Sequence, residues 1–197
     1  MKIASVCLCM LLIGGSAAAA ADDSLFDLQT NFRTDTRFND FISPMTNPVF
    51  FEDPRMLTEA RFIFANHSLP DTLAGGGDLQ LYALQLRARL TENLSFIATK
   101  DGFFVSDNAV TDDGWADLAA GLKLNLWSCP EEQFLLSTGF TFEFPTGQTR
   151  ALQGNGHGEF NLFVTGGWEI LENVHWLSAA GVRLPSDRND ENQSGVG

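Results

Sequence analysis

Apolar and polar residues alternate almost strictly between residues 114 and 145, and this pattern limits the possible folds more than any other feature of the chain. Every second position of residues 116–126 is apolar, and residues 134–144 repeat the pattern with one exception, Thr138. Because successive side chains of a β-strand point to opposite faces, each stretch predicts a strand with one apolar and one polar face. Such strands suit a soluble sandwich, whose apolar faces meet in a core, or an outer-membrane barrel, whose apolar faces contact lipid.

The first 21 residues have the layout of a secretory signal peptide. Lys2 precedes an apolar stretch over residues 3–13, and the small residues 17–21 offer a cleavage site before Asp22. We therefore expect the chain to be exported and leave residues 1–21 out of the fold. Without this leader, Cys129 is the one cysteine of the chain, so no internal disulfide is expected.

Residues 22–55 predict an irregular segment, because Pro44, Pro48 and Pro54 interrupt any long helix or strand. We interpret it as a periplasmic or plug segment. Residues 56–197 are expected to form the barrel region. They end in a polar, turn-like stretch, residues 187–197, rather than on a strand that closes the wall, so we expect this region to be truncated.

Seven strands are predicted, at residues 57–66, 79–90, 94–105, 114–126, 134–144, 159–170 and 174–184. The apolar parity changes within residues 79–90, which predicts a β-bulge near Tyr82 and Ala83. The connections alternate between long loops, at residues 68–77, 106–113 and 146–157, and short turns. Outer-membrane barrels sort their loops in this way, so the pattern favours an all-β, up-and-down antiparallel transmembrane β-barrel over a sandwich.

The polar faces of these strands predict the residues that line the lumen. Strand parity selects ten candidates: Glu59, Arg61, Gln85, Arg87, Arg89, Lys123, Glu143, Glu159, Glu169 and Arg183. They could form a constriction that filters solutes by charge and size. Alternatively, they could pair across strands and close a narrow interior, because both signs of charge are present.

Composition and motifs argue against other functions. The chain carries 25 acidic and 12 basic residues, a net charge of −13, which argues against binding nucleic acid. No nucleophile motif accompanies the histidines, and no His or Cys pair has the spacing of metal ligands. We therefore expect no catalytic residues, no metal and no cofactor.

The strand over residues 114–126, with Gly114, Asp117, Gly121 and Lys123, is followed by a strand that ends in Phe-Pro-Thr-Gly at residues 144–147. Together they resemble the outer-membrane barrels described as phenol-degradation (meta-pathway) proteins. The resemblance covers residues 114–184. It implies a transporter-like barrel that passes small organic compounds, aromatic ones among them.

We thus expect a protein of the cell outer membrane, in contact with lipid and with small organic solutes. The predicted function is a channel for passive diffusion of small solutes, including hydrophobic or aromatic ones. The alternatives are a non-conducting structural or adhesive barrel and a secreted β-sandwich that binds a ligand. The oligomeric state is left open.

Overall fold

The computed structural model describes residues 32–44, 47, 49–70, 76–107, 111–154 and 156–186. The predicted leader, residues 22–31 and the polar residues 187–197 lie outside the described residues. The described part is all-β, with one sheet of nine strands and two short 3-10 helices, η2 (Thr36–Phe38) and η3 (Thr149–Ala151). These helical turns do not provide a helix that could span a bilayer. The strands are β1 (Glu59–Ser68), β2 (Asp78–Arg89), β3 (Leu94–Lys100), β4 (Phe103–Ser106), β5 (Gly114–Trp115), β6 (Leu118–Cys129), β7 (Phe134–Phe144), β8 (Glu159–Leu171) and β9 (Val174–Pro185).

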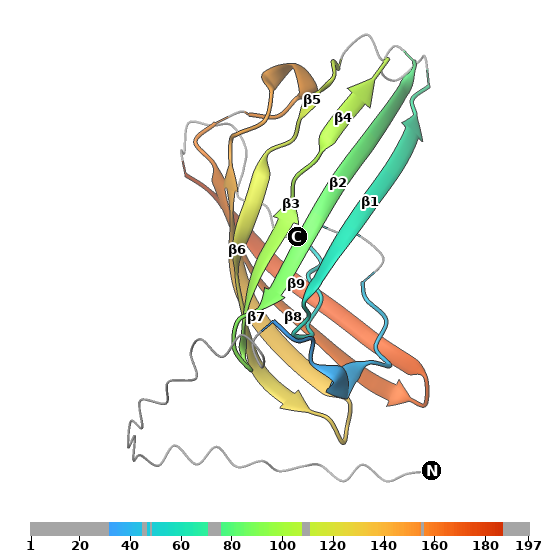
Figure 1. Ribbon diagram of the computed structural model, residues 1–197, viewed down its shortest axis with the longest axis vertical. Helices are drawn as coiled ribbons and strands as arrows, with labels where there is room; N and C mark the ends of the chain where they lie inside the picture. The colour runs from blue at the N-terminus through green and yellow to red at the C-terminus, as the bar shows by residue number, and fades with distance from the viewer. Residues whose placement is uncertain are drawn as a thin grey trace.

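All neighbouring strands of the sheet are antiparallel, which confirms the predicted all-β antiparallel arrangement (Figure 1). β3 and β4 pair with successive parts of β2 and together occupy the next position in the sheet. β6 pairs with β3 and β5 pairs with β4, so β5 and β6 together occupy the position after that. The nine strands therefore occupy seven positions side by side, and these correspond to the seven predicted strands. Short turns join β2 to β3, β6 to β7 and β8 to β9, and the longer loops lie at the opposite end of the sheet.

The predicted bulge at Tyr82 and Ala83 is wrong. β2 pairs with β1 in unbroken register from Glu59 opposite Arg87 to Ser68 opposite Asp78. The interruption lies in the neighbouring chain segment instead, between β3 and β4. There the carboxylate of Asp101 accepts the N–H of Leu84 at 2.7 Å, and Gly102 adopts a φ of +144° that a larger residue rarely takes.

The sheet is twisted and curved, and it is not closed into a barrel in the part that the structure describes (Figure 1). Within that part, β1 pairs with β2 and β9 pairs with β8, so each has one edge without a neighbouring strand. The described residues therefore form a single antiparallel sheet, and the closure predicted from the sequence is not shown.

The two faces of the sheet differ sharply in chemistry. We call the face that carries Arg87, Lys123 and Thr165 the inner face, and the opposite one the outer face. The inner face holds buried polar side chains, namely Gln85, Arg87, Ser95, Lys123, Asn125, Ser137, Thr141, Asn161 and Thr165. The outer face holds exposed apolar ones, among them Phe62, Leu84, Leu86, Leu122, Leu124, Phe140, Leu162, Val164, Trp168, Trp176 and Val182. This distribution is the reverse of that in a water-soluble domain.

The described residues between 32 and 57, which we call the N-terminal segment, lie against the inner face (blue to cyan in Figure 1). Phe38 and Phe41 of this segment form a small buried cluster with Leu135 of β7, and Leu177 of β9 packs against it. Backbone hydrogen bonds from Phe32 to Arg89 and from Asp35 to Met56 hold its two ends. The inner face is therefore covered by the chain's own irregular segment.

Candidate functional site on the inner face

Three deeply buried charged side chains, from two strands and the N-terminal segment, meet in the middle of the inner face. Arg87 of β2 donates from Nε and Nη2 to the two carboxylate oxygens of Glu52, at 2.8 and 2.7 Å. Lys123 of β6 donates from Nζ to the same carboxylate at 2.9 Å. All three side chains are at most 3% exposed. We call Glu52, Arg87 and Lys123 the Glu52 cluster.

Strands of the sheet also bind the backbone of the N-terminal segment next to the Glu52 cluster. The Lys123 Nζ donates to the carbonyl oxygens of Asp53 and Arg55, at 2.6 and 2.7 Å. Ser137 of β7 donates to the carbonyl of Pro54, and Thr165 of β8 donates to that of Glu52, both at 2.7 Å. Because buried carbonyls need donors and residues 52–55 lie outside any helix or strand, side chains of the sheet supply these donors. Four strands thus hold residues 52–55.

Arg55 ties the two halves of the N-terminal segment together. Its guanidinium pairs with Asp53, with Nη2 2.8 Å from Oδ2, and donates to the carbonyl of Phe41 at 2.7 Å and to Ser43 Oγ at 2.8 Å. Asp53 and Arg55 are both buried. The stretch around η2 is therefore linked through Arg55 to the stretch that contacts the Glu52 cluster.

Burial alone would raise the pKa of Glu52, but the charge of Lys123 and the hydrogen bond from Arg87 hold this pKa below the ordinary value of a glutamate. In the same way, burial opposes ionisation of Asp53, and the hydrogen bond and charge of Arg55 still lower its pKa. Both carboxylates are therefore ionised in the docked segment, where they neutralise buried cations of the wall and of the segment itself.

A second group of charges lies toward the long-loop end of the inner face. Lys100 of β3 pairs with Glu143 of β7 at 2.5 Å and approaches Asp117 at 4.0 Å. Asp117 accepts the backbone N–H groups of Gly147 and Gly154, at 2.8 and 2.9 Å. This carboxylate therefore folds the long loop between β7 and β8 against the start of β6.

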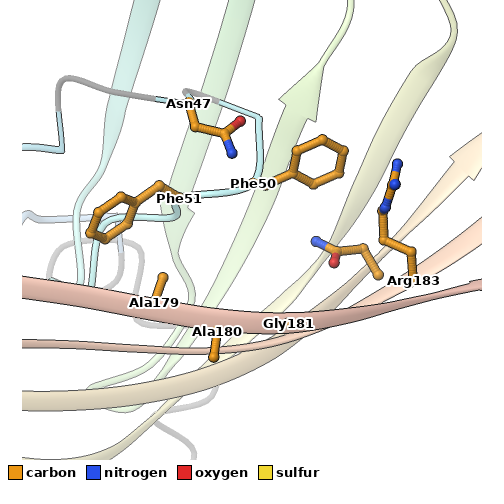
Figure 2. A pocket seen from close by; sticks show the side chains of 8 residues that line it. Asn47, Phe50, Phe51, Ala179, Ala180, Gly181 and Arg183 are labelled. Carbon is orange, nitrogen blue, oxygen red and sulfur yellow. The ribbon is translucent and has the colours of Figure 1, made fainter. Parts of the chain in front are cut away.

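A cavity of about 190 Å³ lies between the N-terminal segment and the last two strands (Figure 2). Arg183 of β9 stands over the ring of Phe50, with its Cζ 5.2 Å from the ring centroid, and its Nε is 3.8 Å from Glu159. The lining combines two phenylalanine rings and three small residues with a few polar side chains. The residues that line it are Asn47, Phe50, Phe51, Asn161, Ala179, Ala180, Gly181 and Arg183.

The register of the strands assigns all ten predicted lumen residues to the inner face. They do not form one ring. Arg87 and Lys123 meet at Glu52, and Glu59 joins them with a 2.8 Å contact to Arg87 Nη1.

The other seven candidates do not contact Glu52, and one of them, Arg61, shares the Glu59 carboxylate with Arg87. Their contacts are Arg61 to Glu59, Gln85 to the Thr99 carbonyl, Arg89 to the carbonyls of Thr91 and Arg33, Glu143 to Lys100, Glu159 to Arg183, and Glu169 to the N–H of Asn173. Arg61, Glu143, Glu159 and Arg183 are therefore in ion pairs, whereas Arg89 and Glu169 bind backbone groups.

The sequence prediction missed the residues of the N-terminal segment that complete the site, Glu52, Asp53 and Arg55, and the hydroxyl groups of Ser137 and Thr165. One signal was available for the first three. The stretch Glu-Asp-Pro-Arg at residues 52–55 places three charges within a proline-rich segment that is otherwise apolar around Phe50 and Phe51.

In the described part of the chain, no group of three or more His, Cys, Asp and Glu side chains is arranged to hold a metal ion. No family model, curated protein or solved structure matches the chain. The resemblance to the phenol-degradation barrels therefore remains a prediction from residues 114–184.

Proposed function

We propose that this chain forms the wall of an outer-membrane β-barrel, which acts as a channel for passive diffusion of small solutes, hydrophobic or aromatic ones among them. The observation that carries the proposal is the division of the sheet into an exposed apolar outer face and a buried polar inner face. An apolar surface that runs across neighbouring strands is unfavourable in water and is satisfied by lipid.

The lengths of the strands agree with this proposal. The six long strands contain 10 to 13 residues each. A tilted strand needs about 9–11 residues to cross the hydrocarbon region of a bilayer. Trp127, Trp168 and Trp176 lie near the short turns, and Phe144 and Phe160 lie near the long loops. Aromatic residues at both ends of the strands are typical of the two membrane interfaces.

A secreted sandwich is a weaker interpretation of the same strands. A sandwich buries the apolar face of one sheet against a second sheet. Among the described residues, the covering element is the N-terminal segment, and it packs on the polar inner face instead. The apolar outer face keeps large exposed side chains such as Phe62 and Trp176.

The proposal requires that β1 and β9 both have partners in the membrane. Unpaired backbone N–H and C=O groups at a lipid-exposed edge cost several kcal/mol each by order of magnitude, so an open sheet is not stable in a bilayer. Closure of the sheet is therefore the property that an experiment has to test first.

A second candidate function is a non-conducting structural barrel. It is favoured by one observation: the N-terminal segment fills the inner face at the level of Glu52, and its charges are neutralised there. The cavity beside Phe50 and Phe51 favours the channel, because it leaves room for a small solute between this segment and β9.

The full-length gene product should be recovered from an outer-membrane fraction and run on an SDS gel with and without boiling. A closed barrel resists SDS, so we expect a shift in mobility upon boiling. Planar-bilayer recording of the same sample then separates the two candidates, because a channel gives discrete conductance steps and a structural barrel gives none. Recovery in the soluble periplasmic fraction, without a shift, would reject both.

A further inference from the structure

The Glu52 cluster is a carboxylate-binding site whose ligand belongs to the chain itself. Arg87 presents two parallel N–H donors, and Lys123 adds a third donor to the same carboxylate. A guanidinium fork of this kind matches the geometry of any carboxylate. The two cations come from the strands β2 and β6, whereas the anion comes from the irregular N-terminal segment.

We propose that Arg87 and Lys123 form an anion site of the barrel wall, which Glu52 occupies while the N-terminal segment is docked and which binds the carboxylate of a small organic solute when the segment leaves. The inference deepens the proposed function, because it names the class of solute. It rests on that function only for the route by which the solute arrives.

The charges of the wall explain why an anion would be required there. In the part of the chain that the structure describes, Lys123 forms its ion pair with Glu52 and meets no carboxylate of another strand within salt-bridge distance. Arg87 retains Glu59, which is 30% exposed. If residues 52–55 move away, the Lys123 ammonium loses one carboxylate and two carbonyl partners at once. Two neighbouring cations of the sheet, Arg87 and Lys123, would then have lost the carboxylate that they share, so their combined positive charge would attract an anion from the lumen to the vacated place.

The neutral donors of the wall favour the same ligand. Ser137 of β7 and Thr165 of β8, the two strands that follow β6 in the sheet, donate to carbonyls of the segment at 2.7 Å. After the segment leaves, these hydroxyl groups are free to donate to the oxygens of a bound carboxylate. The site would thus combine two cations with two hydroxyl groups, an arrangement that favours oxyanions over cations.

The binding site can be tested without any measurement of transport. In a Glu52→Ala variant the carboxylate is missing, and sodium acetate can supply it. We expect acetate to raise the midpoint temperature of unfolding by about 2–4 °C, whereas acetamide, or sodium chloride at equal ionic strength, leaves it nearly unchanged. A Glu52→Ala/Lys123→Met double variant should lose the response to acetate. An equal effect of acetate and acetamide, or an unchanged response in the double variant, would overturn the proposed site.

A second variant tests whether the site controls permeation. This test remains valid even if Glu52→Ala does not fold. Glu52→Gln keeps the shape of the side chain and removes its charge. We expect it to raise the ratio of anion to cation permeability in planar bilayers by about twofold or more. Glu132→Gln, which makes the same charge change in an exposed turn, should leave the ratio unchanged.

The outcomes separate this inference from the proposed function. Conducting channels in which Glu52→Gln leaves the permeability ratio at the wild-type value would overturn the role of Glu52 while the channel stands. A specific acetate effect in a protein that never conducts would support the anion site and reject the channel.

Discussion

Arg87 and Glu52 lie 35 residues apart in the sequence and form a bidentate ion pair on the inner face, with N···O distances of 2.8 and 2.7 Å. Both side chains are 2% exposed. The pair therefore joins an irregular segment to the second strand of a sheet in surroundings from which water is largely excluded. It is one of several buried contacts that hold residues 52–55 against the sheet.

Arg87→Lys should loosen this attachment, because a lysine cannot donate in parallel to both carboxylate oxygens. We expect a loss of about 1.5–3 kcal/mol in the docking of the segment. Since about 1.4 kcal/mol corresponds to a factor of ten, tryptic cleavage after Arg55 should become at least about tenfold faster. Arg61→Lys is the matched control. Its pair with Glu59 is partly exposed, so cleavage should change little. Equal rates in the two variants would contradict the role of Arg87.

Acid should release the N-terminal segment. The pKa values of Glu52 and Asp53 are lower in the docked segment than their usual values of about 4.3 and 3.9. The stabilisation is therefore complete above those usual values and is lost as the pH falls through the lowered ones. A nitroxide label at Phe51→Cys in a Cys129→Ser background should become progressively more mobile as the pH is lowered from about 4 towards about 2. Glu52→Gln removes one of the titrating groups, so its acid response should be smaller. A label that is equally immobile at pH 7 and pH 2 would refute this prediction.

Gly121 of β6 is required by close backbone packing. A Cβ at this position would overlap the carbonyl oxygen of Phe140 on β7. We expect Gly121→Ala to destabilise the sheet by at least about 2 kcal/mol, the upper part of the range for overpacked sites. At Gly166 the nearest atom to an added Cβ is a carbonyl oxygen at 3.2 Å, so Gly166→Ala should cost less than about 1 kcal/mol. The midpoints of urea unfolding in detergent compare the two variants, and similar midpoints would show that the β6–β7 contact has more room than described.

A charge on the outer face should interfere with membrane insertion. Val164 lies near the middle of β8, is 45% exposed and faces outward. Val164→Arg should cost about 2–4 kcal/mol if this position contacts the middle of the bilayer. Ala179→Arg places the same charge on the inner face, beside the cavity, and should be tolerated. The fraction of each variant that shifts on an unboiled SDS gel measures insertion. Equal fractions for the two variants would argue against lipid contact at Val164.

Much of the sheet could be predicted from the sequence because strand periodicity is a local property. The alternation over residues 116–126 and 134–144 indicated both the strands and the faces on which Lys123 and Leu122 lie. The breaks beside Gly102 and after Trp115 were not predicted, because they depend on how neighbouring strands pair. The error at Tyr82 has the same origin: the unbroken pairing of β2 with β1 places Leu79 and Leu81 on the inner face without any bulge.

The candidate site was predicted only in part, for a physical reason. Arg87 and Lys123 were found from strand parity, which assigns them to the polar face. Glu52 has no periodic neighbours, and its contact with Lys123 spans 71 residues. A contact at that separation leaves no local pattern. The charges at residues 52–55 hinted at a polar environment, but not at which strands would provide it.

The central claim is that the outer face contacts lipid and the inner face does not. Ala179 and Ala180 are consecutive residues of β9 whose side chains point to opposite sides of the strand (Figure 2). Nitroxide labels at these two positions, in a Cys129→Ser background in bilayers, can be compared by their collisions with oxygen, which partitions into lipid, and with a water-soluble nickel chelate. We predict that oxygen dominates at position 180 and the nickel chelate at position 179. Dominance of the nickel chelate at position 180 would contradict a membrane-embedded sheet.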